Sequence, residues 1–198
     1  MRRGRDIARA GIFALCLAAG AGSAADPEEK TNPLVVIETT RGRITVELLA
    51  AQAPQTVASF LRYVDEKFYD GTVFHRVLPG SIVQAGGFTA KLEEKPTHES
   101  IPCESRPGVG NNKGTLAMAR GADPDSATSQ FFINLRANAH LNFKRPTRDG
   151  RGYTVFGRVL EGMDVVAAIG SMTTRTVGEL RDVPEELVEI RSMRRAAP

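Results

Sequence analysis

The sequence predicts a mainly β protein built on an antiparallel sheet, with two modest helices. Several short runs are rich in β-branched and aromatic residues, only two stretches show helical spacing, and 19 glycines and 11 prolines spread along 198 residues mark many turns. A closed barrel with a helix at each end would leave no sheet edge exposed and would give both helices a surface to cover. The pattern favours this barrel without requiring it.

The composition is that of an ordinary globular protein, with 41% hydrophobic and 25% charged residues. It excludes a disordered, collagen-like or coiled-coil chain, and the length suits one domain or at most two small ones. The formal charge of +3 arises in the first 25 residues, because residues 26–198 carry 22 basic and 22 acidic side chains. Such a balance gives no reason to expect a nucleic-acid partner.

Residues 1–25 have the pattern of a secretory signal peptide: a basic start, an uncharged run from Ala10 to Ala25, and small residues at the end. The run is shorter than the roughly 20 residues that span a bilayer. We therefore expect export to the periplasm, cleavage after Ala24 or Ala25, and no stable membrane association afterwards. An uncleaved membrane anchor is the alternative.

The elements follow in order after a polar linker, 26–33. Residues 34–49 read as a hairpin around Arg41-Gly42, with alternate residues of its second strand on one face. Pro54 suits the first turn of a helix that ends near Lys67, because apolar residues follow it at helical spacing.

The rest of the chain is predominantly extended. Residues 72–88 form two extended runs around a Pro79-Gly80 turn, and 89–113 and 136–151 are irregular. Further strands are predicted at 114–119, 131–135, 153–160 and 187–193, and a short helix at 162–170. With no internal repeat or boundary, 34–193 is expected to be one domain, followed by a tail at 194–198.

Common catalytic and metal-binding patterns are missing from the sequence. It contains no G-x-S-x-G, H-E-x-x-H, P-loop or C-x-x-C motif, and His75, His98 and His140 are scattered. Cys103, the one cysteine after the leader, has no neighbour at metal spacing and is expected to be structural or incidental. We therefore expect no metal and no cofactor.

Two strands instead mix polar and apolar residues. Because alternate residues of a strand share a face, Arg76 should lie with Phe74 and Leu78, and Gln130 with Phe132 and Asn134. A solvated outer face is one explanation. The occurrence of two such strands favours a groove lined by apolar rings and amide donors.

Four blocks carry a family resemblance: FHRVLPGSIVQAGG (74–87), GTLAMAR (114–120), ATSQFFINL (127–135) and YTVFGRVLEGMDVV (153–166). In this order they resemble the signature blocks of cyclophilins, and of their exported bacterial branch, over residues 34–193. The resemblance implies a closed eight-stranded antiparallel barrel capped by two helices. It also implies peptidyl-prolyl cis-trans isomerase activity on proline-containing polypeptides, here exported proteins during folding.

The resemblance also assigns the site. Arg76 would donate a hydrogen bond to the nitrogen of the twisted X–Pro bond, a role suited to a permanently charged group with five donors. Gln84 and Gln130 would bind the peptide or orient Arg76. The remaining site residues it implies are Phe132, Ile82 and Leu141 around the proline ring, the backbone of Ala119 and Arg120 beside the preceding residues, and the Tyr153 hydroxyl near a carbonyl.

Three positions depart from the family pattern. Ser81 replaces a usual phenylalanine, which opens one wall of the proline pocket. His140 stands where members that bind cyclosporin tightly have tryptophan, so weak cyclosporin binding is expected. Arg120 replaces a frequent asparagine and is expected to favour acidic residues before proline. His75 should point to the opposite face from Arg76, as a hydrogen-bonded structural histidine without a catalytic part.

The sequence is compatible with three functions. The first is an active isomerase, expected to be a monomer. The second is a non-enzymatic or weakly active chaperone module that binds proline peptides on the same fold, because Ser81 alters the pocket. The third is an unrelated small barrel that holds a lipid or another small ligand in an interior cavity.

Overall fold

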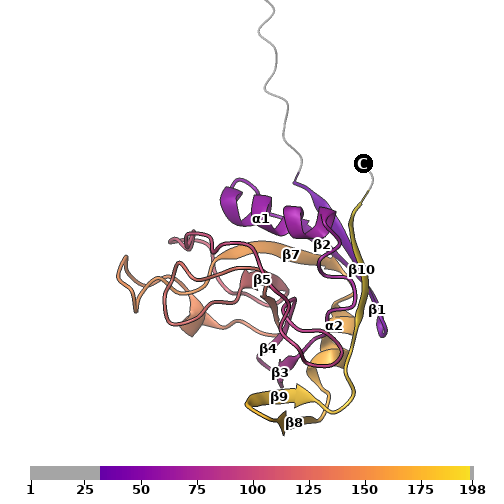
Figure 1. Ribbon diagram of the computed structural model, residues 1–198. Helices are drawn as coiled ribbons and strands as arrows, with labels where there is room; N and C mark the ends of the chain where they lie inside the picture. The colour runs from indigo at the N-terminus through magenta and orange to yellow at the C-terminus, as the bar shows by residue number, and fades with distance from the viewer. Residues whose placement is uncertain (1–31, 197–198) are drawn as a thin grey trace, which may run out of the picture. The chain divides into compact units, whose positions relative to one another are not determined.

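An eight-stranded antiparallel sheet forms the body of the computed structural model, which describes residues 32–196. The predicted signal peptide lies outside the described residues. Along the sheet the strand order is β10-β1-β2-β7-β5-β6-β4-β3, and a separate two-stranded sheet pairs β8 with β9 (Figure 1). The elements are β1 (Leu34–Thr39), β2 (Gly42–Leu48), α1 (Pro54–Asp65), β3 (Arg76–Leu78), β4 (Ile82–Ala85), β5 (Thr115–Met118), β6 (Phe131–Asn134), the 3₁₀ helix η1 (Ala139–Leu141), β7 (Val155–Glu161), α2 (Met163–Gly170), β8 (Thr174–Val177), β9 (Leu180–Pro184) and β10 (Ile190–Arg195).

The mainly β class, the eight antiparallel strands and the two helices are confirmed. Strands β10 and β3 are the two ends of the ladder, and the chain segments before them are joined by backbone hydrogen bonds. Ile190 N donates to Thr72 O at 2.8 Å, and Phe74 N donates to Val188 O at 2.9 Å. No strand ladder joins β10 to β3 in the described chain, so a fully closed barrel stays a prediction.

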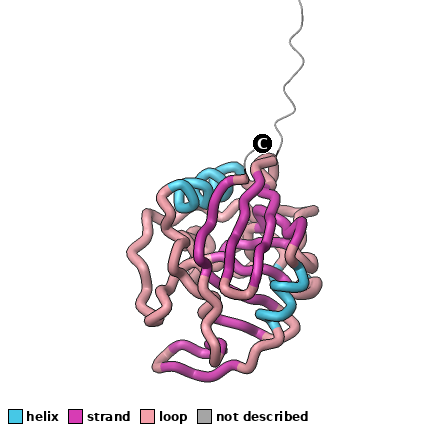
Figure 2. Tube along the Cα trace, turned by 90° about the vertical axis from the view of Figure 1, so that its right-hand side faces the viewer, coloured by secondary structure: helices cyan, strands magenta, loops and turns pink. Residues whose placement is uncertain are grey.

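The core fills the inner face of the sheet and is sealed by the helices. In β1 and β2 alternate residues are fully buried, as the hairpin pattern predicts, and they include Ile37 and Ile44, which face each other across the pair. Helix α1 adds Phe60, whose ring meets Phe131 edge-on with centroids 5.6 Å apart. Figure 2 shows α1 and α2, in cyan, against separate parts of the strands.

Helix α1 lacks a capping side chain of its own. Ala53 at the N-cap makes no side-chain hydrogen bond, and Pro54 begins the helix as predicted. The carboxylate of Glu104, from the irregular 89–113 segment, accepts hydrogen bonds from the backbone N–H groups of Gln55 and Thr56 at 3.1 and 2.7 Å. A residue 48 to 49 positions away therefore satisfies two of the free donors of the first turn.

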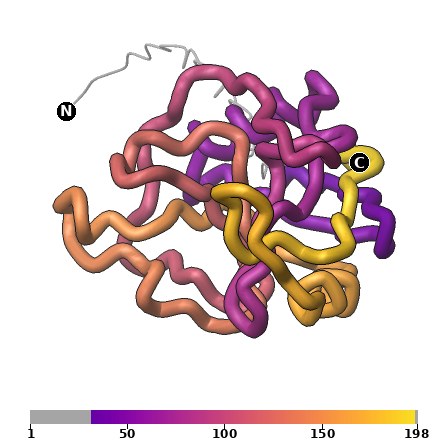
Figure 3. Tube along the Cα trace, turned by 60° about the horizontal axis from the view of Figure 1, so that its bottom comes forward, coloured from indigo at the N-terminus to yellow at the C-terminus, as the bar shows by residue number. Residues whose placement is uncertain are grey.

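Three details differ from the sequence-based expectation. Strand β7 begins at Val155 rather than residue 153, and β10 runs from Ile190 to Arg195 rather than over 187–193. The β8–β9 hairpin was not predicted, because its short strands lack an alternating apolar pattern; β8 has no buried residue, and β9 buries only Val183 and Pro184 at its end. It lies against β3 (Figures 1 and 3). In the described segment, no helix has the length and apolar character needed to cross a membrane.

Candidate active site

The site starts from one row of residues that crosses four strands. Arg76 of β3 faces Gln84 of β4, which faces Phe132 of β6, which faces Ala117 of β5. The next residue along β3, Val77, is fully buried in the main core, so alternation turns Arg76 to the other face of the sheet. The strand register therefore brings a cation, an amide and an aromatic ring together on the outer surface.

A pocket of about 260 Å³ opens over this row. Ten of the eleven predicted site residues line it, together with Leu78: Arg76, Ser81, Ile82, Gln84, Ala119, Arg120, Phe132, His140, Leu141 and Tyr153. The eleventh, Gln130, lies in the adjoining pocket. The structure thus brings together segments that are up to 77 residues apart in the sequence.

The floor of the pocket is apolar. Phe132 is only 2% exposed and packs with Ile82, Ala117 and Val155 in a small cluster separate from the main core. The Tyr153 ring meets Phe132 edge-on with centroids 5.5 Å apart. A flat apolar floor of this kind suits a small saturated ring, because burial of apolar surface is the main gain available to it.

Arg76 is held from two sides while its side chain stays 41% exposed. Its Nη1 donates to Gln84 Oε1 at 3.4 Å, and its Nε lies 3.6 Å from Asp182 Oδ2 on β9. A guanidinium carries five N–H donors in a fixed fork, so these two contacts leave others directed at solvent and the pocket.

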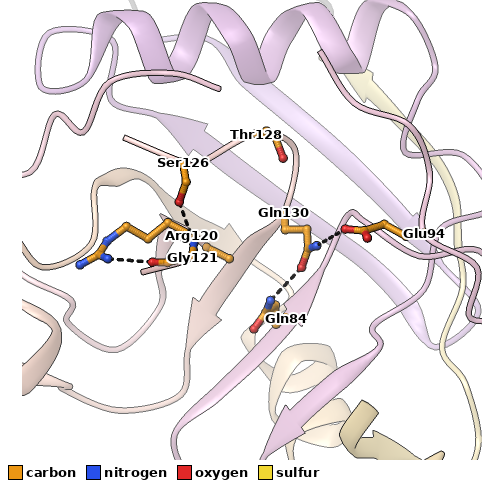
Figure 4. Close-up of a pocket in the computed structure, with 8 residues that line it drawn as sticks. Gln84, Glu94, Arg120, Gly121, Ser126, Thr128 and Gln130 are labelled. Carbon is orange, nitrogen blue, oxygen red and sulfur yellow. Dashed lines mark hydrogen bonds between the residues drawn. The ribbon is translucent and has the colours of Figure 1, made fainter. Parts of the chain in front are cut away.

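The contact with Gln84 is the first link of a polar chain. Gln84 Nε2 donates to Gln130 Oε1 at 2.9 Å, and Gln130 Nε2 donates to Glu94 Oε1 at 3.4 Å (Figure 4). Because Arg76 can only donate and an ionised Glu94 can only accept, the two charged ends fix the direction of both amides. Gln84 therefore presents its oxygen to Arg76.

Gln130 rests against Gly87. A Cβ added to this glycine would lie 2.5 Å from Gln130 Cγ and 2.7 Å from its Nε2, too close for any other residue without displacing the amide. The second glycine of the sequence QAGG thus makes room for the link between Gln84 and Glu94.

A second pocket, of about 300 Å³, adjoins the first and shares Gln84, Ala119 and Arg120 with it. Figure 4 shows the residues that line it; the others are Glu94, Gly121, Ser126, Thr128 and Gln130. Within this set Ala119 N donates to Gln130 O at 2.9 Å, so its N–H is already used by the sheet.

Arg120 is folded back toward the first pocket. Its Nε donates to Gly152 O and its Nη1 to Gly121 O, both at 3.0 Å, and the guanidinium lies 4.7 Å from the centre of the Tyr153 ring. In Figure 4 it points away from Glu94. The cation expected at the groove rim is thus engaged with two carbonyls and a ring.

The predicted placement of Phe74 is wrong. Phe74 is fully buried in the main core, because β3 begins only at Arg76 and the preceding residues pair with the segment before β10. His75 is also buried, with its ring centroid 4.6 Å from that of Phe88. Burial lowers the pKa of His75 to about 4, so the ring is neutral at physiological pH. Among the described residues its Nδ1 has no hydrogen-bond partner.

Ser81 closes the predicted turn and faces the pocket. Its N–H donates to Leu78 O at 2.9 Å across Pro79-Gly80, and Gly80 has the positive φ of +66° that the turn requires. The Ser81 hydroxyl donates to Asn138 Oδ1 at 3.3 Å. The Ser81 hydroxyl therefore forms part of the pocket wall at the position where the family pattern has a phenylalanine ring.

Two residues at the site, Glu94 and Asp182, were missed from the sequence. Leu78, which alternation placed on the face of Arg76, does line the pocket with it. Glu94 lies in the irregular segment 89–113, and Asp182 lies in the unpredicted hairpin with a left-handed φ of 59°. No local pattern marks these two acids, because only the packing of distant segments brings them to Gln130 and Arg76.

Comparison with known proteins gives a consistent picture. Residues 34–195 match the family model described as cyclophilin type peptidyl-prolyl cis-trans isomerase. A peptidyl-prolyl cis-trans isomerase of Streptomyces antibioticus is 49% identical over 158 residues, which cover 80% of this chain and 95% of that protein. Peptidyl-prolyl cis-trans isomerase B of Escherichia coli is 45% identical over 160 residues, covering 81% and 98%.

Solved structures agree in fold. A cyclophilin from Hirschia baltica has a TM-score of 0.65 at 26% identity, covering 81% of this chain and 72% of that one. A Cryptosporidium parvum cyclophilin-type isomerase has a TM-score of 0.69 at 23% identity, covering 84% and 99%. A further structure of the latter was determined in the presence of the dipeptide Ala-Pro.

Proposed function

We propose that this chain, which belongs to the cyclophilin-type peptidyl-prolyl cis-trans isomerase family, accelerates X–Pro bond rotation through Arg76 and the pocket over Phe132. Membership of this family favours isomerase activity and rules out the unrelated ligand-binding barrel. The roles of the individual residues are part of the proposal.

The reaction breaks no covalent bond. Rotation of an amide must pass a barrier of about 18–20 kcal/mol, because resonance is lost at the twisted geometry. There the proline nitrogen regains its lone pair and becomes a better hydrogen-bond acceptor. A donor aimed at it binds the twisted state more tightly than the planar state, and this difference is what lowers the barrier.

The single observation that carries the proposal is the position of Arg76. Its guanidinium stands at the edge of an apolar floor formed by Phe132 and Ile82, with Nη1 on Gln84 and Nε beside Asp182. With the proline ring on Phe132, a remaining N–H of Arg76 would point at the ring nitrogen. The cation needs no proton transfer, so the step requires no titrating group and no cofactor.

Magnetisation-exchange NMR on a short Ala-Pro peptide tests this assignment. The chain from residue 26 onward should accelerate exchange, and Arg76→Ala should lose most of that acceleration, since each 1.4 kcal/mol of transition-state stabilisation is worth about tenfold in rate. Arg43→Ala, which removes an exposed arginine paired with Glu38, is the matched control and should keep full activity. Equal rates for Arg76→Ala and the unmodified chain would refute the role of Arg76.

Ser81 supports a second candidate, a module that binds proline peptides with little turnover. The hydroxyl is tied to Asn138, and the wall it forms is open compared with one that carries an aromatic ring. This candidate predicts peptide resonances that shift on titration without faster exchange. In that outcome Ser81→Phe is the next variant, and a gain of activity would identify the missing ring as the cause.

Cellular placement follows from the leader. We propose that residues 1–25 direct export to the periplasm and that the remaining chain acts there as a monomer on exported polypeptides, without stable membrane association or nucleic-acid binding. The exposed His140 on the pocket rim supports weak cyclosporin binding. Inhibition by low nanomolar cyclosporin would overturn that part.

A further inference from the structure

We infer that a basic rim beside the first pocket binds an acidic segment of the polypeptide whose proline the pocket holds. The basic rim consists of four exposed cations, Lys113, Arg136, Lys144 and Arg148. The inference rests on the proposed function for the proline itself. It concerns a part of the substrate that lies several residues away from that proline.

Basic and acidic residues are separated along the sequence. Residues 106–120 and 136–151 together hold eight basic side chains and a single acidic one, Asp149. The rest of residues 26–198 holds the other 14 basic and the other 21 acidic side chains. The neutral balance of this chain therefore combines a strongly basic part with an acidic remainder, and the basic part attracts anions.

The two basic segments lie side by side in the fold. Asn138 N donates to Asn111 O, and Gly114 N donates to Asn134 O, both at 2.8 Å. The second of these bonds brings the turn that holds Lys113 next to the start of the second segment. Figure 1 shows the second segment, in orange, projecting on the side of the sheet away from β1 and β10. The cations therefore gather on one side of the molecule.

The cations of the basic rim have no carboxylate partner within residues 32–196. Arg136 Nε donates to the neutral amide of Asn138 at 3.3 Å, and Asp149 is already paired with Arg145. Exposed arginines on other elements do have such partners: Arg41 with Glu186, Arg43 with Glu38, Arg62 with Glu66, Arg158 with Glu47 and Arg195 with Asp65. The carboxylates that complement the basic rim must therefore come from a bound partner.

The loop that carries Lys144 and Arg148 is already folded. Lys144 N donates to Gly150 O at 2.7 Å, and Gly150 N donates to Thr147 O at 2.9 Å. A Cβ added to Gly150 would lie 2.7 Å from Arg145 O, so the chain closes tightly on itself there. Because the backbone is fixed before binding, an acidic partner does not have to order it.

The ends of this loop belong to the first pocket. His140 and Leu141 precede it, Tyr153 follows it, and all three line the pocket. An extended chain advances about 3.3 Å per residue, so a substrate with its proline over Phe132 reaches the basic rim about four to seven residues away. The continuity of pocket and basic rim favours an acidic stretch of the same polypeptide as the partner.

The apolar surface argues against a lipid partner. The exposed large apolar side chains of the described chain are Leu34 on β1 and Leu160 on β7, and neither lies in the two basic segments. A surface that binds a bilayer combines its cations with apolar side chains that enter the acyl boundary. The basic rim offers cations alone.

The experiment compares blocked peptides that share an Ala-Pro core. At the stated distance, before or after the proline, each carries a run of four aspartates, four asparagines or four lysines. NMR titration of the isotope-labelled chain measures the dissociation constants. At low salt the aspartate run, on at least one side, should bind about five- to tenfold more tightly than the asparagine run, since each exposed ion pair contributes little. The preference should shrink as salt is raised.

A charge-matched pair of variants assigns the preference to the basic rim. Lys144→Gln combined with Arg148→Gln should give the aspartate and asparagine peptides nearly equal dissociation constants. Lys67→Gln combined with Arg191→Gln removes two exposed cations from other parts of the surface and should keep the preference. Equal effects of the two double variants would show that only net charge matters and would overturn the inference, as would equal binding of all three peptides.

Two further measurements separate the other outcomes. Arg76→Ala should keep the preference for aspartate in the titration, because it leaves the basic rim intact. Absence of accelerated exchange with every peptide therefore refutes the proposed function without altering the test of the basic rim. Sedimentation with vesicles of phosphatidylglycerol and phosphatidylcholine tests the lipid alternative: binding that Lys144→Gln with Arg148→Gln abolishes, without any peptide preference, would overturn the inference in favour of a lipid surface.

Discussion

Asp182 lies on the side of Arg76 opposite to Gln84. Its Oδ2 is 3.6 Å from Arg76 Nε, and the residue adopts a φ of 59°, a conformation that aspartate and asparagine tolerate better than most residues. Asp182 and Gln84 thus contact two different nitrogens of the guanidinium, Nε and Nη1. We therefore regard Asp182 as a positioning residue that acts through Arg76 without touching the substrate.

Replacing Asp182 by asparagine should lower kcat about two- to fivefold, because a half-exposed ion pair is worth at most about 1 kcal/mol. The peptide dissociation constant and the free energy of unfolding should change little, since asparagine keeps the backbone preference. Exchange NMR and peptide titration measure the two effects. Glu185→Gln, three residues away, is the control and should leave both unchanged. An unaltered kcat in Asp182→Asn would show that Gln84 suffices to hold Arg76.

At the residue scale, the sequence predicted the residues that line the pocket better than the acidic residues that contact Arg76 and Gln130. Ten of its predicted residues line one pocket. The family resemblance assigned them, and alternation within the short strands explains only why those that lie in strands, such as Arg76 and Gln84, share a face. The chain of contacts from Asp182 to Glu94 was not predictable. It links four separate segments, and no periodicity within one segment specifies its neighbours in space.

Among the elements, α1 shows that local sequence can predict a helix without predicting which residue stabilises its N-terminus. Its apolar stripe and Pro54 predict the helix, and Phe60 confirms the buried face. Its N-terminus, however, depends on Glu104, which also accepts a hydrogen bond from the Thr56 hydroxyl at 2.6 Å. The segment 89–113, predicted only as an irregular loop, therefore stabilises a helix.

Glu104→Ala should destabilise the fold by about 1 kcal/mol, the usual value of a helix N-cap, since two backbone donors lose their acceptor. Urea unfolding followed by circular dichroism measures this loss. Glu99→Ala, an exposed acid in the same segment, should unfold at the concentration found for the unmodified chain. If Glu104→Ala also unfolds at the urea concentration of the unmodified chain, water replaces the carboxylate with no loss of stability.

For the molecule as a whole, His75 couples folding to pH. Burial holds its pKa at about 4 in the folded state, against about 6.5 for an unfolded chain. Between pH 4 and pH 6.5, His75 is mostly protonated in the unfolded state and mostly neutral in the folded state. Stability from this source is therefore complete above pH 6.5 and falls as the pH drops toward 4.

The free energy of unfolding should fall by about 3 kcal/mol between pH 7 and pH 4 through His75 alone. His75→Gln should show a shallower loss in the same window, measured by urea unfolding at each pH. Hydrogen bonds from Arg194 and Arg195 lower the pKa values of Asp70 and Asp65, so both proteins should lose further stability at lower pH. Parallel curves for the two proteins would show that His75 can be protonated without unfolding.

The sequence by itself determined the strands, the two helices and the face on which Arg76 and Phe132 lie, because these depend on local periodicity and turn residues. The order of the strands and the β8–β9 hairpin depended on the tertiary structure. So did the acids at each end of the Arg76 chain and the second pocket, because each of these features joins residues that are far apart in the sequence. A contact of that kind is selected by the packing of the whole core, and no single segment specifies it.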